Sequence, residues 1–346
     1  MTAAKEFGVF LPVASGGWIV SRNTPVLDGG WPQNRDAALI AEEEGLDFVM
    51  SMGKWRGFGG DTSHWGSSLE SVTMMAGIAA LTKRVKIWAT LHAILHNPVV
   101  AAKMIATLDH VSGGRAGLNI VAGAYRGEFE QMNAWDAKLD HDARYDLTEE
   151  WLTIIRKLWT EEKTNFSGKY FIIKDCVSDP KPLNPPELIC AGMSARGFDF
   201  SVRHADACFI GGADQAETRA ASLRAKSLSE KLGKSIKTYA MCTIIHGDSD
   251  AAAEKTAAHY REGLDEGAVL GMLESYGLAG NAMTARARGA FMTHTVIGAP
   301  STCAEQMEHF IRDCALDGLM LIFDDYKEGL RITGREILPR LRNALA

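Results

Sequence analysis

Short apolar runs alternate along the whole chain with longer segments in which apolar residues recur at helical spacing. The apolar runs occupy residues 6–13, 47–52, 84–91, 116–123, 187–193, 206–212, 239–247 and 318–325. Near-continuous apolar runs of this length are typical of parallel strands that are buried on both faces. The segments with helical spacing include 34–46, 67–82, 97–114, 145–162 and 334–345. The pattern therefore predicts eight strand–helix units.

Eight parallel units are accommodated most economically by a closed barrel. Closure removes both sheet edges, and right-handed crossovers place every helix on the outside. A doubly wound open sheet is the alternative, but it needs a glycine-rich dinucleotide fingerprint directly after the first strand. That position holds only Gly16 and Gly17. No linker rich in Pro, Ser or Gly divides the chain. We expect an α/β fold with one (β/α)8 TIM-barrel domain over residues 1–346.

Four insertions interrupt the predicted barrel, at about 53–66, 124–143, 163–180 and 276–300. Residues 163–180 contain two short alternating runs, which predict a β-hairpin. Residues 276–300 are polar and rich in Gly and Ala, and a loop of that length is typical of a lid or an oligomer contact.

The ends of two predicted helices carry specific signals. A Ser/Glu start signal opens the segment 67–82, and Pro98 stands where the first turn of a helix tolerates proline. Gly113 and Gly114 are expected to end that second helix.

Charge and composition exclude several classes of partner. Lys and Arg total 37 against 43 Asp and Glu, giving a formal net charge of −6, and no polybasic block occurs. Nucleic acid is therefore not an expected partner. No apolar run is long enough to span a bilayer, and the first residues lack the order of a signal peptide. We expect a cytoplasmic protein with no membrane partner.

The six cysteines do not form a Cys-x-x-Cys pair, and most of them stand in apolar runs. We expect them to be small core side chains in a reducing compartment, with no metal site.

One amide, Asn119, interrupts the apolar run 116–123. A buried amide must find hydrogen-bond partners or it destabilises the fold. Two interpretations are open: a structural amide satisfied by backbone groups, and an amide directed at a polar ligand at the end of the strand. The second gains support from the barrel, because the chemistry of such folds gathers at the carboxyl ends of the strands.

Two positions suit a phosphate group. Ser194 precedes a predicted helix, where exposed N–H groups, the helix dipole and a hydroxyl group favour an anion, although a simple N-cap explains it equally well. Arg144 and Tyr145 stand at the opening of another helix, where an arginine opposes the dipole unless it binds a phosphate. A solvated arginine is the alternative.

Other polar residues allow weaker hypotheses. His92 and His96 are four residues apart, and such a pair could bind a metal ion if both residues stood on one helix. They instead follow a predicted strand, so a metal site is not favoured. Asp324 and Asp325 end the last strand and suit either a general base or a helix cap. The chain has no recognisable nucleophile arrangement, which indicates that a cofactor performs the chemistry.

Several segments together resemble the bacterial luciferase-like flavin-dependent monooxygenases, and within them the pyrimidine oxygenases of uracil degradation and the related sulfone and amide monooxygenases. The likeness is carried by residues 51–82, 106–123, 126–133, 144–159 and 189–198, and it extends over essentially the whole chain.

The resemblance implies specific roles. Gly53 and Lys54 would line the flavin, and Asn119 and Glu128 would approach its ring system. Thr90 would lie near the face of the ring that reacts with oxygen and would act with Asn119 in catalysis. Arg144, Tyr145 and Ser194 would hold the phosphate of FMN.

The resemblance also implies the reaction. A separate reductase that uses NAD(P)H would supply FMNH2, and its reaction with O2 would give a flavin peroxide that attacks an electrophilic carbon. In the pyrimidine oxygenases this breaks a ring C–N bond. Members of the family are commonly homodimers or homotetramers.

The chain departs from the pyrimidine oxygenases around the expected substrate site. Ala124 and Tyr125 stand where those enzymes usually have a tryptophan, and His92 and His96 also differ. These four residues are our candidate substrate contacts, and the substrate is expected to be an N-heterocycle or cyclic amide other than uracil.

Three alternatives stay open. One is a sulfone or alkanesulfonate monooxygenase that cleaves a C–S bond, for which extra arginines are available at positions 56, 126, 286 and 288. The others are a deazaflavin-dependent oxidoreductase and a flavin-binding protein without catalytic activity.

Overall fold

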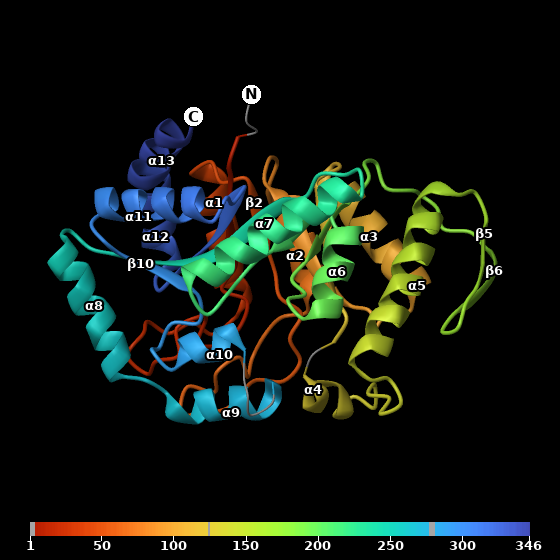
Figure 1. Cartoon of the computed structure of the whole chain (residues 1–346), viewed down its shortest axis with the longest axis horizontal. Helices are drawn as coiled ribbons and strands as arrows, with labels where there is room; N and C mark the ends of the chain where they lie inside the picture. Colours follow the sequence, from red (N-terminus) through yellow and green to blue (C-terminus); the bar gives the residue numbers. More distant parts are fainter. Residues whose placement is uncertain (1–3, 124, 277–280) are drawn as a thin grey trace. The chain divides into compact units, whose positions relative to one another are not determined.

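The computed structural model, drawn in Figure 1, describes residues 4–123, 125–276 and 281–346. Its Cα positions divide into two compact units. The first unit comprises Met1–Met50, Lys54–Leu69 and Phe209–Ala346, and the second comprises Ser51–Gly53 and Glu70–Cys208. That residues 1–346 form a single domain stays a prediction.

The first unit contains five parallel strands in the order β10-β9-β11-β1-β2. They are β1 (Glu6–Phe10), β2 (Phe48–Met50), β9 (Lys237–His246), β10 (His294–Gly298) and β11 (Gly318–Phe323). Its helices are α1 (Trp31–Glu43), α7 (Gln215–Lys231), α8 (Asp250–Glu262), α9 (Glu266–Tyr276), α10 (Ala282–Ala287), α11 (Pro300–Asp313), α12 (Tyr326–Ile332) and α13 (Leu338–Leu345), with a π-helical turn at Thr333–Ile337. β1 and β11 approach so closely that a β-carbon at Gly318 would lie 1.9 Å from the carbonyl oxygen of Glu6.

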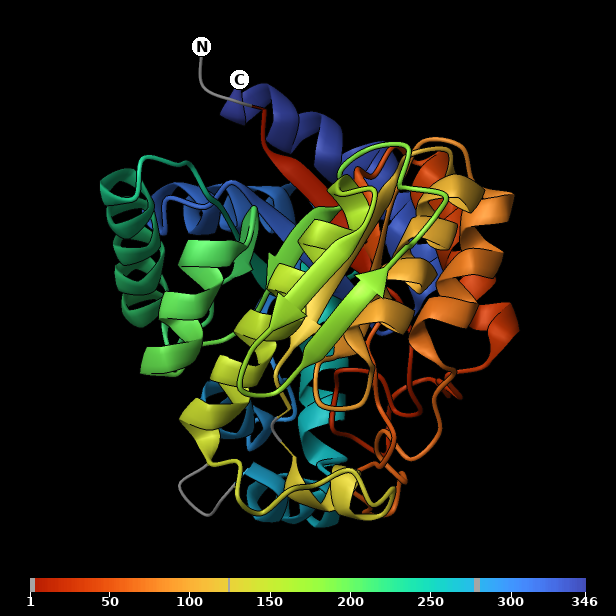
Figure 2. The same cartoon turned by 90° about the vertical axis from the view of Figure 1, so that its right-hand side faces the viewer.

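The second unit is built around four parallel strands in the order β3-β4-β7-β8. They are β3 (Lys86–His92), β4 (Ala116–Val121), β7 (Glu187–Cys190) and β8 (Ala207–Phe209), the last residue of which belongs to the first unit. Its helices are α2 (Ser71–Leu81), α3 (Pro98–Ser112), α4 (Arg126–Glu130), α5 (His141–Thr160) and α6 (Ala195–His204). Two antiparallel strands, β5 (Thr164–Ser167) and β6 (Ile172–Cys176), form a hairpin beside α5 (Figure 2).

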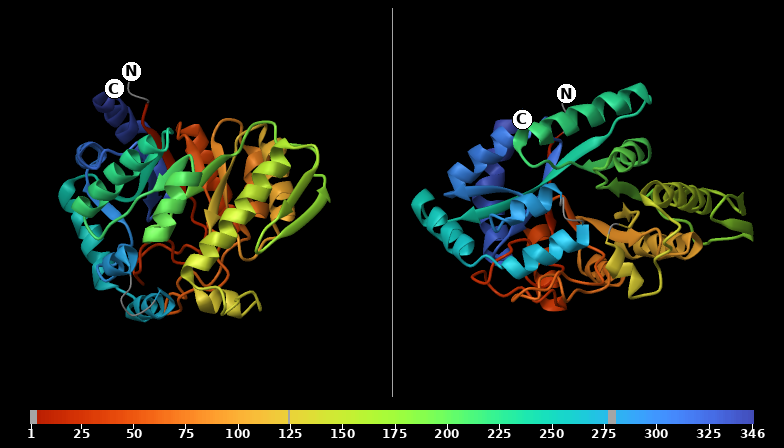
Figure 3. Two further views of the ribbon diagram at one scale, coloured as in Figure 1. Left: turned by 45° about the vertical axis from the view of Figure 1, so that its right-hand side comes forward. Right: turned by 60° about the horizontal axis from the view of Figure 1, so that its bottom comes forward.

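The strand predictions are confirmed element by element. Each of the eight apolar runs contains all or most of one strand, and the predicted hairpin in 163–180 is present. The expectation of a long loop at 276–300 is wrong, because 282–287 form α10 and 294–298 form β10, which pairs with β9 (Figure 3, where α9 and α10 lie side by side in light blue). The short alternating run of β10 was hidden within a segment rich in Gly and Ala.

The helix-end predictions are confirmed in part. Pro98 is the first residue of α3, and Gly113 ends it in the left-handed conformation with φ of 71°. The predicted Ser/Glu start of α2 is wrong: the helix begins at Ser71, and the N-cap is Glu70. Its carboxylate accepts hydrogen bonds from the backbone N–H groups of Val72 and Thr73 at 3.0 and 2.7 Å. The glutamate thus takes the capping role that a serine side chain often has.

The cysteines behave as predicted for core residues. None forms a disulfide, and five are buried: Cys190, Cys208, Cys242, Cys303 and Cys314. Among the described residues, no helix combines the length and apolar character required to cross a bilayer.

Candidate functional site

The register of β3 and β4 brings two predicted site residues together. Thr90 and Asn119 are directly paired across the two strands, so their side chains project from the same face of the sheet. Both are only 4% exposed. Two pairs earlier, and so on the same face of the sheet, Trp88 lies opposite Gly117, where a β-carbon would lie 2.4 Å from the indole ring. The glycine thus makes room for a buried tryptophan beneath the Thr90–Asn119 pair.

Four side chains at this end of the unit form a hydrogen-bonded group, which we call the neutral cluster: Ser51, Ser71, Thr90 and Asn119. The Thr90 hydroxyl donates to the carbonyl oxygen of Ser51 at 2.6 Å and accepts from Asn119 Nδ2 at 3.0 Å. The Thr90 backbone N–H donates to Ser71 Oγ at 2.8 Å, and the two serine hydroxyls are 2.6 Å apart. All four residues are buried, and none carries a charge.

The Asn119 amide is only half satisfied. Its nitrogen bonds to Thr90, but its Oδ1 atom is buried and has no hydrogen-bond partner among the described residues. A buried acceptor without a partner costs about 1–3 kcal/mol. Backbone groups do not satisfy this amide, so the observation favours the second interpretation of Asn119, an amide directed at a ligand.

His92 and Gly53 pack against the neutral cluster. A β-carbon at Gly53 would lie 2.9 Å from His92 Cε1 and 3.5 Å from Thr90 Cγ2, so the glycine permits a close approach of the backbone. The His92 ring is buried and contacts the edge of Phe129, with ring centroids 5.3 Å apart. His96 is half-buried, and its Nδ1 atom lies 3.0 Å from the carbonyl oxygen of His92.

The other predicted contacts of this region have distinct positions. Glu128 is buried in the short helix α4. Tyr125 is half-buried at the N-cap of that helix. Ala124 lies outside the described residues. The cofactor and substrate roles of these residues stay predictions.

Lys54 belongs to the first unit, where it is buried against aromatic rings. Its Nζ atom lies 4.7 Å from the centre of the Phe58 ring and 5.8 Å from that of Trp65. His64 stacks on Trp65 in the same group, and neither of its ring nitrogens has a hydrogen-bond partner among the described residues. Burial lowers the pKa of His64 to about 4, a shift that Asp265 opposes. The role of Lys54 beside a flavin stays a prediction.

A second group of polar residues lies where α5 and α6 begin. Arg144 stands in the first turns of α5, where its Nε donates to the carbonyl oxygen of Gly123 at 3.2 Å and its Nη1 to that of Leu139 at 3.0 Å. The guanidinium lies 4.7 Å from the centre of the Trp135 ring. Burial lowers the pKa of Arg144, while Tyr145 and Asp140 oppose the shift, and an arginine stays protonated under such conditions. Of its five N–H donors, these bonds use two.

Tyr145 and Ser194 meet across the two helices. Ser194 is the N-cap of α6 and accepts from the Gly197 N–H at 3.1 Å, which confirms the cap interpretation and leaves the anion interpretation untested. A β-carbon at Gly197 would lie 2.3 Å from the Tyr145 hydroxyl and 2.9 Å from Ser194 Oγ. Burial raises the pKa of Tyr145, so its hydroxyl keeps its proton at neutral pH. This glycine therefore leaves room for two hydroxyl groups at the start of α6.

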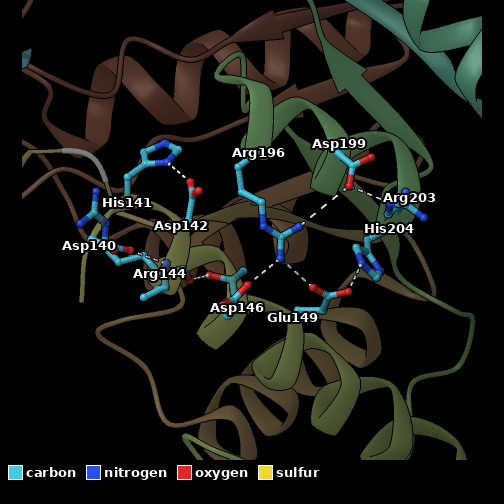
Figure 4. A network of polar contacts seen from close by, with 12 residues as sticks. Asp140, His141, Asp142, Arg144, Asp146, Glu149, Arg196, Asp199, Arg203 and His204 are labelled. Atoms are coloured by element: carbon cyan, nitrogen blue, oxygen red, sulfur yellow. Dashed lines mark hydrogen bonds and ion pairs between the residues drawn. The ribbon is translucent and has the colours of Figure 1, made fainter. Parts of the chain in front are cut away.

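Five charged or titratable residues join α5 to α6, and we call them the charged network (Figure 4): Asp146, Glu149, Arg196, Asp199 and His204. Arg196 Nη2 lies 2.8 Å from Asp146 Oδ1 and 2.9 Å from Glu149 Oε2. His204 Nε2 lies 3.1 Å from Glu149 Oε1. Hydrogen bonds to Asp146 and Glu149 raise the pKa of Arg196. The carboxylates offset an arginine that otherwise opposes the dipole of α6.

Residues considered for other chemistry have structural partners. Asp325 is the N-cap of α12, which confirms the cap interpretation, and Asp324 accepts from the Tyr260 hydroxyl at 2.7 Å. Arg286 donates to the carbonyl oxygen of Gly212, and Arg126 pairs with Glu130 at an exposed position.

An apolar groove of about 620 Å³ lies elsewhere on the second unit, between α2, α3 and the residues that follow β6. It contains none of the predicted site residues, so it is not the candidate site.

Ser51, Ser71, Gly197 and Arg196 are among the residues that sequence reasoning missed. Ser51 directly follows the apolar core of a predicted strand, and polar residues at the carboxyl ends of barrel strands are candidates for a site. The other three carried no signal, because their partners come from distant segments.

Known proteins match this chain over nearly its whole length. The family model described as luciferase-like monooxygenase matches residues 5–317. Pyrimidine monooxygenase RutA of Variovorax paradoxus (strain S110) is 34% identical over 348 residues, which cover 97% of this chain and 94% of that protein. The corresponding protein of Enterobacter sp. (strain 638) is also 34% identical, over 96% of this chain and 95% of its own length.

Solved structures share the fold. The riboflavin lyase RcaE, solved with modified FMN and riboflavin, matches with a TM-score of 0.87 at 20% identity and covers 99% of this chain and 92% of its own. The EDTA monooxygenase EmoA from Chelativorans sp. BNC1 matches with a TM-score of 0.81 at 20% identity, over 99% and 94% of the two chains. These likenesses confirm the predicted (β/α)8 TIM-barrel class.

Proposed function

The chain belongs to the luciferase-like monooxygenase family and is a flavin-dependent monooxygenase; from this premise we propose that it uses FMNH2 and O2 to cleave a C–N bond in an N-heterocycle or cyclic amide. The observation that carries the proposal is the Oδ1 atom of Asn119, which is buried toward the carboxyl ends of β3 and β4 and has no hydrogen-bond partner among the described residues. A polar heterocycle bound there supplies the missing partner.

The residues of the second unit fit the two ends of FMN. The neutral cluster offers a directional amide to a heterocyclic ring, and His92 and Phe129 contribute ring surfaces beside it. Arg144, Tyr145 and Ser194 offer a cation and two hydroxyl groups near the start of a helix, which suits a phosphate. We assign ring recognition to the first group and phosphate binding to the second.

When bound, the reduced flavin supplies the electrons that activate O2. The chain contributes position and polarity: buried apolar strands keep water away from the ring, and the Asn119 amide directs a polar group toward it. The Thr90 hydroxyl donates its hydrogen bond to the Ser51 carbonyl oxygen, so we assign Thr90 a role that it exerts through Asn119. Glu128 and Gly53 complete the assigned flavin site.

The substrate class is supported by two relatives named pyrimidine monooxygenases, each 34% identical over nearly the whole chain. We assign His92 to substrate contact ahead of His96, because His92 packs beside the neutral cluster whereas His96 turns toward backbone. A separate flavin reductase that oxidises NAD(P)H is the proposed partner and supplies FMNH2.

An isotope experiment tests the proposal. Purified protein is incubated with ¹⁸O2, FMN, NADH and a generic flavin reductase, together with pyrimidines, pyridines, lactams and sulfones, and the products are read by mass spectrometry. A ring-opened product with one heavy oxygen atom is expected. Heavy oxygen only in sulfur compounds would favour C–S cleavage, and tight flavin binding without incorporation would overturn the proposed cleavage of C–N bonds in these compounds.

A further inference from the structure

The hydrogen atoms of the neutral cluster determine which way the Asn119 amide faces. Thr90 has one hydroxyl hydrogen, and it donates this hydrogen to the carbonyl oxygen of Ser51, which can only accept a hydrogen bond. Toward Asn119 the Thr90 oxygen is therefore only an acceptor. It requires the NH2 side of the amide at 3.0 Å, and Oδ1 must face the other way.

Ser51 and Ser71 hold Thr90 in this arrangement. The Ser51 backbone, which accepts the Thr90 proton, is itself fixed by a hydrogen bond from its N–H to the carbonyl oxygen of Trp88 at 3.1 Å. Ser71 Oγ accepts the Thr90 N–H at 2.8 Å and shares a hydrogen bond of 2.6 Å with Ser51 Oγ. Three segments distant in sequence thus converge on one threonine, and all of their groups are buried.

We infer that Ser71 and Thr90 are positioning residues that lock Asn119 Oδ1 as a hydrogen-bond acceptor, and that the site thereby recognises an N–H group of its heterocyclic ligand. A locked acceptor rewards a ligand that brings a proton and disfavours one that presents a lone pair, because two acceptors facing each other leave both unsatisfied.

The proposed function supplies two sources of such an N–H group, and the inference rests on that function in naming them. N5 of an isoalloxazine ring carries hydrogen only when the flavin is reduced, so an acceptor facing it selects FMNH2 over oxidised FMN. A ring N–H of an amide-like heterocycle is the other source. The same locked oxygen serves either one.

The test is equilibrium binding rather than turnover. Oxidised FMN and, under anaerobic conditions, FMNH2 are titrated into the wild type and into Thr90→Val, Thr90→Ser, Ser71→Ala and Thr73→Ala. Valine keeps the shape of threonine without the hydroxyl, and serine keeps the hydroxyl. Thr73 is an exposed residue of the same helix as Ser71 and is the matched control. Uracil is titrated into the protein that holds oxidised FMN.

Thr90→Val and Ser71→Ala are expected to weaken FMNH2 binding by about tenfold and FMN binding by less than about threefold, the size of one misdirected hydrogen bond. Thr90→Ser and Thr73→Ala are expected to bind both forms like the wild type. A loss confined to uracil would support the locked acceptor and assign the N–H to the heterocycle. Thermal unfolding of each variant verifies that it is folded, and the Thr90→Val and Thr90→Ser pair decides the result if Ser71→Ala does not fold.

Equal losses for FMNH2, FMN and uracil, or no loss for any of them, would overturn the inference and leave the proposed function standing. If the wild type bound neither form of FMN, the proposed function would fail, and this inference with it.

Discussion

The neutral cluster and the charged network are held together by different kinds of interaction. In the neutral cluster, uncharged groups are buried and joined by hydrogen bonds of 2.6–3.0 Å. In the charged network, ions bridge α5 and α6 at the surface, and the side chains of Arg196, Glu149 and Asp146 are 25%, 42% and 52% exposed. The first arrangement fixes the direction of a side chain, whereas the second links the two helices that carry the proposed phosphate-binding residues.

The two kinds of interaction respond differently to the surroundings. A buried hydrogen bond is insensitive to salt, and removing one partner leaves the other unsatisfied at a cost of about 1–3 kcal/mol. Ion pairs at the surface are screened by salt and contribute about 0–1 kcal/mol each. If the two regions serve the ring and the phosphate of one ligand, substitutions in each should separate those two parts of the affinity.

The largest expected effect is a loss of phosphate recognition in Arg144→Met. Binding of FMN should weaken by about 100-fold and binding of riboflavin, which lacks the phosphate, should change little, because a charged hydrogen bond contributes about 1.5–3 kcal/mol. Fluorescence titration with both ligands measures the ratio.

Two further variants control this result. Asn119→Leu should weaken FMN and riboflavin by the same factor. Arg144→Lys keeps the positive charge but lacks the planar guanidinium group. The ratio of FMN affinity to riboflavin affinity in this variant should lie between those of the wild type and Arg144→Met. A ratio unchanged in Arg144→Met would show that Arg144 is a solvated side chain held by the carbonyls of Gly123 and Leu139.

The next largest effect is the loss of folding stability in acid that His64 of the first unit causes. This loss must be removed before the pH dependence of the charged network is measured. His64 is buried, its ring nitrogens have no hydrogen-bond partner among the described residues, and burial lowers its pKa from an ordinary value of 6.5 to about 4. The unfolded chain therefore takes up a proton that the folded chain refuses, and stability falls as the pH drops from about 6.5 toward 4. His64→Phe should remove this loss, so its advantage over the wild type should grow by about 2 kcal/mol between pH 7 and pH 5.

Urea unfolding at several pH values measures this advantage. A gap between His64→Phe and the wild type that does not change with pH would mean that His64 titrates normally in the folded protein.

How much of this was readable from the sequence differs between the fold and the site. The eight barrel strands could be predicted because each lies in a near-continuous apolar run. Strand β10 could not be predicted, because its five residues lie in a Gly- and Ala-rich segment. Asn119 was found because an amide that interrupts an apolar run is conspicuous, whereas Thr90 was implied only by the resemblance to the family. The direction of the Asn119 amide was not predictable, because Ser51 and Ser71 set it through Thr90, and those contacts exist only after the chain has folded.

The charged network illustrates the same limit. Arg196 stands beside Ser194 in sequence, yet its partners Asp146 and Glu149 lie on another helix about fifty residues earlier. Only the packing of α5 against α6 identifies it as the residue that holds the two helix starts together.

A smaller effect is expected when that link is cut. Arg196→Met should weaken FMN binding by about fivefold at low salt, with riboflavin unchanged, and the deficit should shrink as ionic strength rises. Arg203→Met is the matched control, because Arg203 stands in the last turn of the same helix. Equal losses for the two variants, or a deficit that salt does not change, would argue against a link through charge.

The smallest expected effect is the pH dependence of folding stability that Glu149 contributes, and it distinguishes the charged network directly from the neutral cluster. Burial raises the pKa of Glu149, but hydrogen bonds from Arg196 and His204 and their charges outweigh it and hold the pKa below its ordinary value of 4.5. The carboxylate thus contributes stability above about pH 4.5, and this contribution is lost as the pH falls through the lowered pKa. In a His64→Phe background, Glu149→Gln should be less stable by at most about 1 kcal/mol at pH 6, since the side chain is partly exposed, and the deficit should shrink as the pH falls below about 4.5. Ser71→Ala should carry a deficit that is constant over the same range in urea unfolding, because nothing in the neutral cluster titrates. A constant deficit for Glu149→Gln, or a pH-dependent one for Ser71→Ala, would remove the distinction between the two regions.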